Sequence, residues 1–156
     1  MTPEERDEAF AWIEKRCTFG IGIVGADVID AHGILTATET AMQQAVAQIA
    51  TVRRPTYLLV DGRDKFWFDY PHSSVIDGDV LEPCIAAASI VAKVTRDRLL
   101  QDMASTFPGY GFEQHKAYGT AEHFAAINRL GPCPTHRRTF LHASVPHTPT
   151  APLPQR

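Results

Sequence analysis

The sequence predicts an α/β protein, because short apolar strands alternate with longer helical segments along the chain. Two strands are predicted, at residues 18–24 and 56–60, among four helices. The second strand is a mostly apolar run, which is typical of a strand buried on both faces. A sheet of two strands is too thin to be stable alone. We therefore expect the sheet to be incomplete.

The N-terminal part is predicted to hold two helices around the first strand. Thr2 can cap the first helix, Pro3 suits its first position, and Glu5 completes a capping box. Residues 25–33 are expected to form a turn region. A second helix, with small and apolar side chains on one face, is predicted over residues 36–52.

The remaining elements follow the second strand, which ends at the turn pair Asp61-Gly62. Residues 63–79 are expected to be irregular, with one possible short strand near Val75-Ile76. Two further helices are predicted, a long one over residues 83–105 and a shorter one over residues 121–130, and a glycine-rich loop separates them.

Length and composition indicate one domain, residues 1–142, followed by a proline-rich tail, residues 143–156, that is expected to be disordered. No apolar run approaches the roughly 20 residues of a membrane helix, so no membrane partner is expected. The charged N-terminus does not resemble a secretory signal. Three well-separated cysteines suggest reduced thiols, so we expect a cytoplasmic protein.

Charge is distributed unevenly along the chain. Residues 61–82 hold six acids and two bases, whereas residues 93–142 hold seven bases and four acids. An acidic segment beside a basic one suits metal ions together with a polyanion. The alternative is an ordinary fluctuation of charge along a globular chain.

Asp61 is the first candidate for chemistry, because it stands where a predicted strand leaves the sheet. In open α/β sheets, ligands bind outside the carboxyl ends of the strands. A carboxylate at this position could hold a cation. The alternative is that Asp61-Gly62 is only a turn, since Asp-Gly is a common turn pair.

Asp79 is the second candidate, because it lies four residues before Pro83 and hence near the start of the long helix. The positive end of that helix would favour a charged carboxylate. The alternative is that Asp77 and Asp79 are turn residues.

Aromatic residues alternate with glycines and bases at residues 107–120. Tyr110, Phe112 and Tyr118 could stack on sugars or bases, and Lys116 could contact phosphate. The alternative is that these aromatics anchor a loop. His136-Arg137-Arg138 could also contact phosphate or form a solvated turn. Cys133 and His136 have zinc-like spacing without a second ligand pair, so zinc is not expected.

Several motifs in a fixed order resemble ribonuclease HII, the type 2 ribonuclease H family. They are Leu58-Leu-Val-Asp-Gly62, Gly78-Asp79 and the helix at residues 85–98, followed by residues 107–112, 115–120 and 131–140. The stretch at residues 33–42 also fits. The resemblance covers roughly residues 2–141, which makes a chance match improbable.

The resemblance implies an RNase H-like fold with a basic, helical C-terminal part. It implies an endonuclease that cuts RNA in RNA–DNA hybrids and single ribonucleotides in DNA, with no obligate protein partner evident. Four carboxylates hold Mg²⁺ or Mn²⁺ in the family. Asp61 matches the third of these carboxylates and Asp79 the fourth. Tyr118 matches the tyrosine that packs against the sugar at the RNA–DNA junction, and Lys116 lies beside it.

One departure from the family pattern is large. The family's first two carboxylates lie in a Gly-x-Asp-Glu-Ala-Gly-Arg-Gly motif on the first strand, and this motif is absent here. Asp7-Glu8-Ala9 resembles part of it but lacks the glycines and falls inside the first predicted helix. We therefore expect the N-terminal sheet strands to be missing. This chain alone is expected to be weakly active or inactive, and the alternative is a non-catalytic nucleic-acid-binding remnant of a truncated gene.

Overall fold

The computed structural model describes residues 1–63 and 66–141. Within it the chain forms two compact units. Of the described residues, unit 1 contains those in the ranges 1–24 and 34–96, and unit 2 contains those in the ranges 25–33 and 97–141. The predicted tail, residues 143–156, lies outside the described residues.

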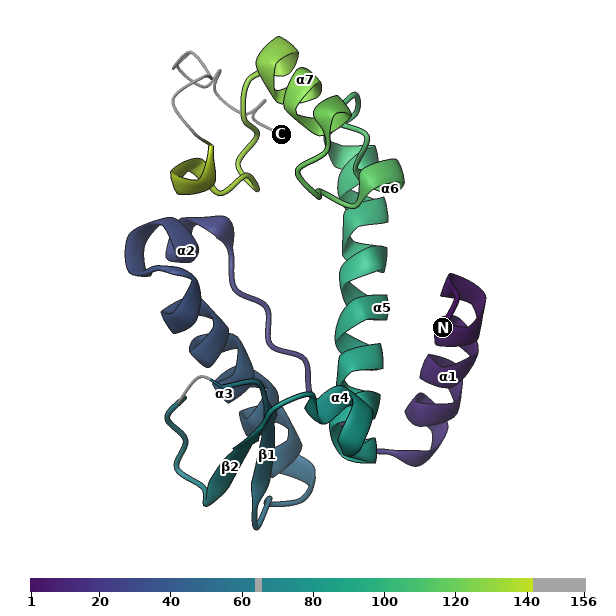
Figure 1. Cartoon of the computed structure of the whole chain (residues 1–156), viewed down its shortest axis with the longest axis vertical. Coiled ribbons are helices and arrows are strands. Elements are labelled where there is room, and N and C mark those ends of the chain that lie inside the picture. Colours follow the sequence, from purple (N-terminus) through teal and green to yellow (C-terminus); the bar gives the residue numbers. More distant parts are fainter. Residues whose placement is uncertain (64–65, 142–156) are drawn as a thin grey trace. The chain divides into compact units, whose positions relative to one another are not determined.

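The secondary structure is mixed and mostly helical (Figure 1). The elements of unit 1 are α1 (Pro3–Arg16), α3 (Ile34–Val52), β1 (Leu58–Asp61), β2 (His72–Val75), α4 (Gly78–Leu81) and the first part of α5 (Pro83–Thr106). Those of unit 2 are α2 (Ala26–His32), the last part of α5, α6 (Phe112–His115), α7 (Ala121–Leu130) and the 3₁₀ turn η1 (Arg138–Phe140).

Helix α1 begins as the sequence predicts. The Thr2 side chain accepts a hydrogen bond from the Glu5 N–H, and the Glu5 side chain accepts one from the Thr2 N–H, so the capping box is present. Buried side chains of α1, among them Phe10 and Ile13, pack with Val91 and Val94 of α5. This apolar contact fixes α1 beside the first part of α5 (Figure 1).

The predicted strand at residues 18–24 is wrong, because this segment pairs with no strand in the part of the chain that the structure describes. Its backbone bonds to side chains of α3 instead. Gln48 accepts from the Ile21 N–H at 3.0 Å and donates to the Ile21 carbonyl at 2.6 Å, while Gln44 accepts from the Ile23 N–H at 3.1 Å. Glutamine amides thus replace the ladder that a neighbouring strand would provide.

Two glycines allow this segment to lie directly on α3. A Cβ atom at Gly20 would lie 2.1 Å from the Ala45 carbonyl oxygen, and one at Gly22 would lie 1.7 Å from that of Ala41. No side chain fits at such distances, so the alternation that resembles a strand pattern reflects close contact between backbones.

The observed sheet has two parallel strands, β1 and β2, with Leu58 opposite His72 and Asp61 opposite Val75 (Figure 1). The second strand, His72–Val75, overlaps the expected short strand near Val75-Ile76 at Val75, where it ends. The prediction that the strand at residues 56–60 is buried on both faces is wrong, since in β1 Leu59 is 38% exposed and only Val60 is buried. Among the described residues β1 pairs with β2 alone, so the other edge of β1 has no strand partner. The exposed Leu59 side chain shows that one face of β1 is also not covered.

Three further helices differ from expectation. The predicted turn region contains α2, which ends at Gly33 with a φ of 82°. Helix α4 is separate from α5, so Asp79 belongs to α4 and not to the start of the long helix. Helix α6 lies inside the aromatic segment, between the left-handed residues Gly111 and Lys116. Short helices of this kind carry little periodic signal in sequence. The long helix and α7 are confirmed.

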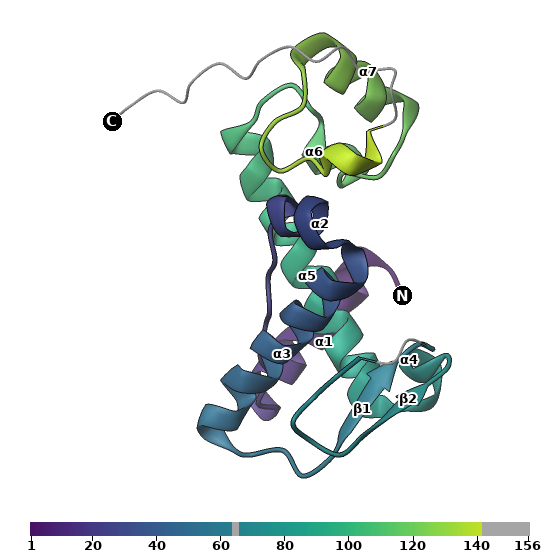
Figure 2. The ribbon, with the colours of Figure 1, turned by 90° about the vertical axis from the view of Figure 1, so that its left-hand side faces the viewer.

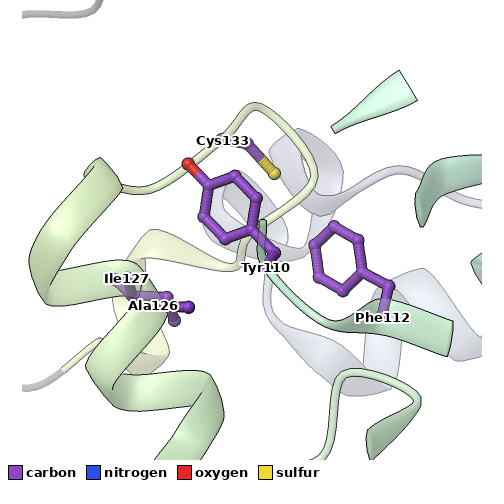
Figure 3. Packing of buried hydrophobic residues seen from close by; sticks show 5 residues of the cluster. All are labelled: Tyr110, Phe112, Ala126, Ile127 and Cys133. Carbon is purple, nitrogen blue, oxygen red and sulfur yellow. The ribbon is translucent and has the colours of Figure 1, made fainter. Parts of the chain in front are cut away.

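Unit 2 has its own apolar core. Tyr110, Phe112, Ala126, Ile127 and Cys133 are buried together, and Figure 3 shows the Tyr110 and Phe112 rings side by side near the Cys133 sulfur. Figure 2 shows α6, α7 and the chain that joins them from a second direction. In the part of the chain that the structure describes, no helix has the length and apolarity needed to cross a membrane.

Candidate functional site

Asp61 is the last residue of β1, and its side chain is exposed. One carboxylate oxygen, Oδ1, accepts a hydrogen bond from the backbone N–H of Gly78 at 2.9 Å. A bond between a carboxylate and a backbone N–H is charge-assisted and therefore stronger than a neutral one. It joins the carboxyl end of β1 to the first residue of α4.

Two side chains approach Gly78 closely, which favours a glycine at this position. A Cβ atom at this position would lie 2.6 Å from Cδ1 of Ile85 and 3.1 Å from Oδ1 of Asp61. Gly78 and Ile85 are both buried. The first turn of α4 is thus held between the end of β1 and the first turns of α5.

Asp79 directly follows Gly78 and is exposed. Although Asp61 and Asp79 are far apart in the chain, Asp61 therefore bonds to the residue next to Asp79. Carboxylate oxygens are the ligands that Mg²⁺ and Mn²⁺ prefer, so this donor set fits such an ion. Among residues 1–63 and 66–141, no group of three or more His, Cys, Asp or Glu side chains is arranged so that it could hold a metal ion. A cation shared by the two aspartates stays a prediction.

The aromatic segment of unit 2 contains both buried and exposed rings. Tyr110 and Phe112 are 8% and 1% exposed and their stacked ring centres are 5.5 Å apart, so neither ring is available to stack on sugars or bases. The Tyr110 hydroxyl donates to the Gly131 carbonyl at 2.6 Å, and burial raises the pKa of this phenol. Both rings anchor the loop, which is the alternative that the sequence left open.

Tyr118 differs from these two rings because 65% of it is exposed. Its neighbour Lys116 forms an ion pair with Asp97, with Nζ and Oδ2 separated by 2.5 Å. A contact between Lys116 and phosphate stays a prediction, and the ammonium would have to be shared with Asp97.

The basic turn after Cys133 is only partly available to a ligand. The sequence left open whether this turn contacts phosphate or is only solvated, and the His136 ring, at 8% exposure, is too buried for either. Arg137 and Arg138 are exposed, and the Arg137 guanidinium lies 5.5 Å from the centre of the Phe140 ring. These two arginines are the cations of this turn that could reach a polyanion.

Asp30 of α2 holds this turn, and sequence reasoning missed it. Its carboxylate accepts hydrogen bonds from the Arg138 N–H at 2.8 Å, the Thr139 N–H at 3.0 Å and the Thr139 hydroxyl at 2.6 Å. The bonds from Thr139, and then that from Arg138, hold the pKa of Asp30 below its ordinary value. These contacts span more than 100 positions of sequence, so no local pattern could have revealed them.

Fold and site together define an α/β protein in which Asp61, at the end of a parallel strand of one unit, bonds to the residue before Asp79, while the other unit carries basic and aromatic surface residues. The family model described as Ribonuclease HII matches residues 13–143. The chain belongs to the ribonuclease HII family.

Curated relatives agree with this family. The Ribonuclease HII of Geotalea uraniireducens is 47% identical over 141 residues, which cover 90% of this chain and 64% of the relative. That of Geobacter metallireducens is 46% identical over 142 residues, or 90% and 65% of the two chains. That of a Bradyrhizobium species is 44% identical over 158 residues, or 99% and 54%. The chain thus spans between about half and two thirds of the length of these relatives.

Proposed function

We propose that this chain supplies part of a metal-dependent endoribonuclease that hydrolyses RNA in RNA–DNA hybrids and cuts at single ribonucleotides in DNA. Family membership supports the reaction class. The observation that carries the proposal for this chain is the 2.9 Å hydrogen bond from the Gly78 N–H to Asp61, because it brings the residue before Asp79 to the end of β1. We propose that the protein works in the cytoplasm.

Asp61 and Asp79 are the proposed metal ligands, for Mg²⁺ or Mn²⁺. Asp61 uses Oδ1 to bind Gly78, so its other oxygen would bind the cation. A bound divalent ion supplies Lewis-acid stabilisation of phosphate charge and an activated water. Two carboxylates provide less negative charge than the four that the family resemblance implies. We therefore propose weak metal binding and little cleavage by this chain alone.

Tyr118 and Lys116 are the proposed substrate contacts. The exposed Tyr118 ring is suited to pack against a sugar, and the Lys116 ammonium to meet a phosphate beside it. Discrimination between RNA and DNA would depend on the 2′-hydroxyl, which only RNA carries.

Non-catalytic binding of nucleic acid is the second candidate function. One observation favours it: in the described part of the chain, no third His, Cys, Asp or Glu side chain lies with the two aspartates to form a metal site. In that case Arg137, Arg138 and Tyr118 would bind a duplex, while Asp61 would serve only to fix α4.

Metal binding tests the first proposal directly. Mn²⁺ is titrated into the 156-residue chain, and the electron paramagnetic resonance signal of the free ion measures how much Mn²⁺ is bound. This titration should show one weak site. Asp61→Asn and Asp79→Asn should each weaken this binding by about tenfold or more, because each removes a charged ligand. Asp69→Asn is the matched control, since Asp69 is an exposed aspartate of the same acidic segment. Equal Mn²⁺ binding by all four proteins would contradict the assignment.

Cleavage separates the two candidate functions. A labelled DNA duplex with one ribonucleotide is incubated with the chain and Mn²⁺. Slow cleavage that Asp61→Asn abolishes would establish catalysis and would contradict the expectation of an inactive chain. Metal-independent binding without cleavage, unchanged in Asp61→Asn, would favour the non-catalytic function.

A further inference from the structure

Three histidine rings lie in a row inside unit 2. His115 belongs to α6, His123 to α7, and His136 to the turn before η1. The His115 and His123 rings stack with 4.4 Å between their centres, and the His123 and His136 centres are 5.2 Å apart. His123 and His136 are buried beside the Phe112 ring. A buried polar side chain in such a place needs hydrogen-bond partners.

The partners of His136 fix the position of its proton. The Cys133 backbone N–H points at Nδ1 over 3.0 Å, and the Cys133 sulfur lies 2.9 Å from the same atom. The Cys133 carbonyl is more distant at 3.3 Å and already accepts from the His136 N–H. A backbone N–H can only donate, so Nδ1 accepts and a neutral His136 carries its hydrogen on Nε2.

The proton of His123 follows from that of His136. The two Nε2 atoms are 3.0 Å apart, and one hydrogen must lie between them. Since His136 provides it, Nε2 of His123 accepts. The hydrogen of His123 is therefore on Nδ1, which donates to the Tyr118 carbonyl at 3.0 Å. The hydrogen bonds run in one direction, from the Cys133 N–H through both rings to Tyr118.

His115 holds the other end of the same loop. Its Nδ1 accepts from the Ala117 N–H at 3.2 Å, so its hydrogen is on Nε2, which donates to the Tyr110 carbonyl at 2.6 Å. Residues 115–120 are thus fixed from two sides, by His115 at their start and by His123 at Tyr118. We call this segment the Tyr118 loop.

The Tyr118 loop needs such support because its backbone is strained. Lys116 and Ala117 have φ angles of 50° and 56°, the left-handed region that residues with a Cβ atom rarely adopt. This conformation is energetically unfavourable for such residues, and two in succession persist only where neighbouring groups hold them. Tyr118 follows these two residues and is 65% exposed.

We propose that His123 and His136 are positioning residues, a relay of two neutral imidazoles that fixes the Tyr118 carbonyl and so aims the Tyr118 ring at the substrate. This inference rests on the proposed function of Tyr118 as a sugar contact. Burial supports it, since it lowers the pKa of His123 and lowers that of His136 to about 4. Both rings are therefore neutral near pH 7, as the direction of the hydrogen bonds requires.

The first test reads the protons themselves. A long-range proton–nitrogen NMR spectrum of the whole chain, labelled with ¹⁵N, distinguishes the two neutral tautomers and the charged form of each histidine. Near pH 7 we expect His136 with its hydrogen on Nε2 and His123 with its hydrogen on Nδ1. A charged ring at either position, or His123 with its hydrogen on Nε2, would overturn the relay. The outcome does not depend on nucleic-acid binding.

The second test uses a matched pair of variants. A glutamine amide can occupy the place of Nε2 and still donate to His123, whereas an asparagine amide reaches only the place of Nδ1. His136→Gln should therefore keep the Nδ1 hydrogen of His123, and His136→Asn should lose that preference. Thr135→Ala is a control that removes only the contact to the Cys133 sulfur.

Binding then connects the relay to Tyr118. Fluorescence anisotropy measures the affinity for a DNA duplex with one ribonucleotide. His136→Asn should weaken binding by about as much as Tyr118→Ala, with no further loss in the double variant, while His136→Gln and Thr135→Ala should bind like the original chain. If Tyr118→Ala weakens binding but His136→Asn does not, the relay has no positioning role and the proposed function survives. If Tyr118→Ala binds normally, Tyr118 is not a substrate contact, and its role in the proposed function and the positioning role both fail.

Discussion

Acid should destabilise unit 2 through His136, and the size of the effect follows from its pKa. Burial, and next the neighbouring His123, lower this pKa from about 6.5 in the unfolded chain to about 4 in the folded protein. Between these two values the unfolded state binds more protons than the folded state, so the free energy of unfolding decreases as the pH falls. The stabilisation is complete above about pH 6.5 and is lost as the pH approaches 4.

Lowering the His136 pKa from about 6.5 to about 4 corresponds to a limiting loss of about 3.5 kcal/mol at about 1.4 kcal/mol per pH unit, of which about 3 kcal/mol is lost at pH 4, where the folded ring is half-protonated. Other titratable groups lie around the ring, namely His115, His123, Cys133 and Tyr110. The pKa of His123 is also lowered and adds to the loss in the same direction. Carboxylates with lowered pKa values, such as Asp30, act in this direction as well.

A comparison of the original chain with His136→Gln isolates the contribution of His136, because the glutamine is neutral at every pH and the other groups are common to both proteins. Urea unfolding is followed by the NMR amide signal of Ile127, a fully buried residue of unit 2, at a series of pH values from about 7 to 4.5. The original chain should lose about 2.5 kcal/mol more than the variant over this range. Parallel curves for the two proteins would refute the assignment of a buried, neutral His136.

Four further outcomes are expected. Gly78→Ala should lower the free energy of unfolding by about 1–3 kcal/mol in urea titrations, since its Cβ would lie 2.6 Å from Ile85, and an unchanged midpoint would disprove this close contact. Thr2→Ala should cost about 1 kcal/mol through the lost cap and reduce helix content in circular dichroism, whereas Thr139→Ala, which caps no part of α1, should leave helix content unchanged. Asp30→Asn should speed hydrogen exchange at the Arg138 and Thr139 amides, and equal protection in both proteins would argue against the carboxylate clamp. Leu59 is exposed and one edge of β1 is open in the described sheet, so the chain should self-associate in analytical ultracentrifugation, and Leu59→Lys should reduce the self-association. A sharp monomer boundary for the original chain would contradict this expectation.

The sequence identified the features that depend on neighbouring residues. The capping box at Thr2, the long helix from Pro83 and the helix between Thr120 and Gly131 were all predicted, because caps, glycine stops and 3.6-residue periodicity act within a few positions. The order of motifs also predicted the family to which the chain belongs. Asp61 was singled out because it follows an apolar strand.

The tertiary structure decided what depends on distant partners. Residues 18–24 have the alternation of a strand, yet side chains of α3 take their backbone hydrogen bonds. Tyr110, Phe112 and Tyr118 look alike in sequence, but only Tyr118 is exposed, because Ala126, Ile127 and Cys133 enclose the other two rings.

The proton positions of His115, His123 and His136 are the features that sequence patterns are least able to predict. Each is set by a backbone group or a second ring at least two residues away, and in the pair of His123 and His136 by residues 13 positions apart. A local pattern fixes which residues are helical or apolar, because those preferences arise within a turn of the chain. Only the folded chain determines which buried polar atoms meet, since a hydrogen bond requires atoms within about 3 Å whatever their separation in sequence.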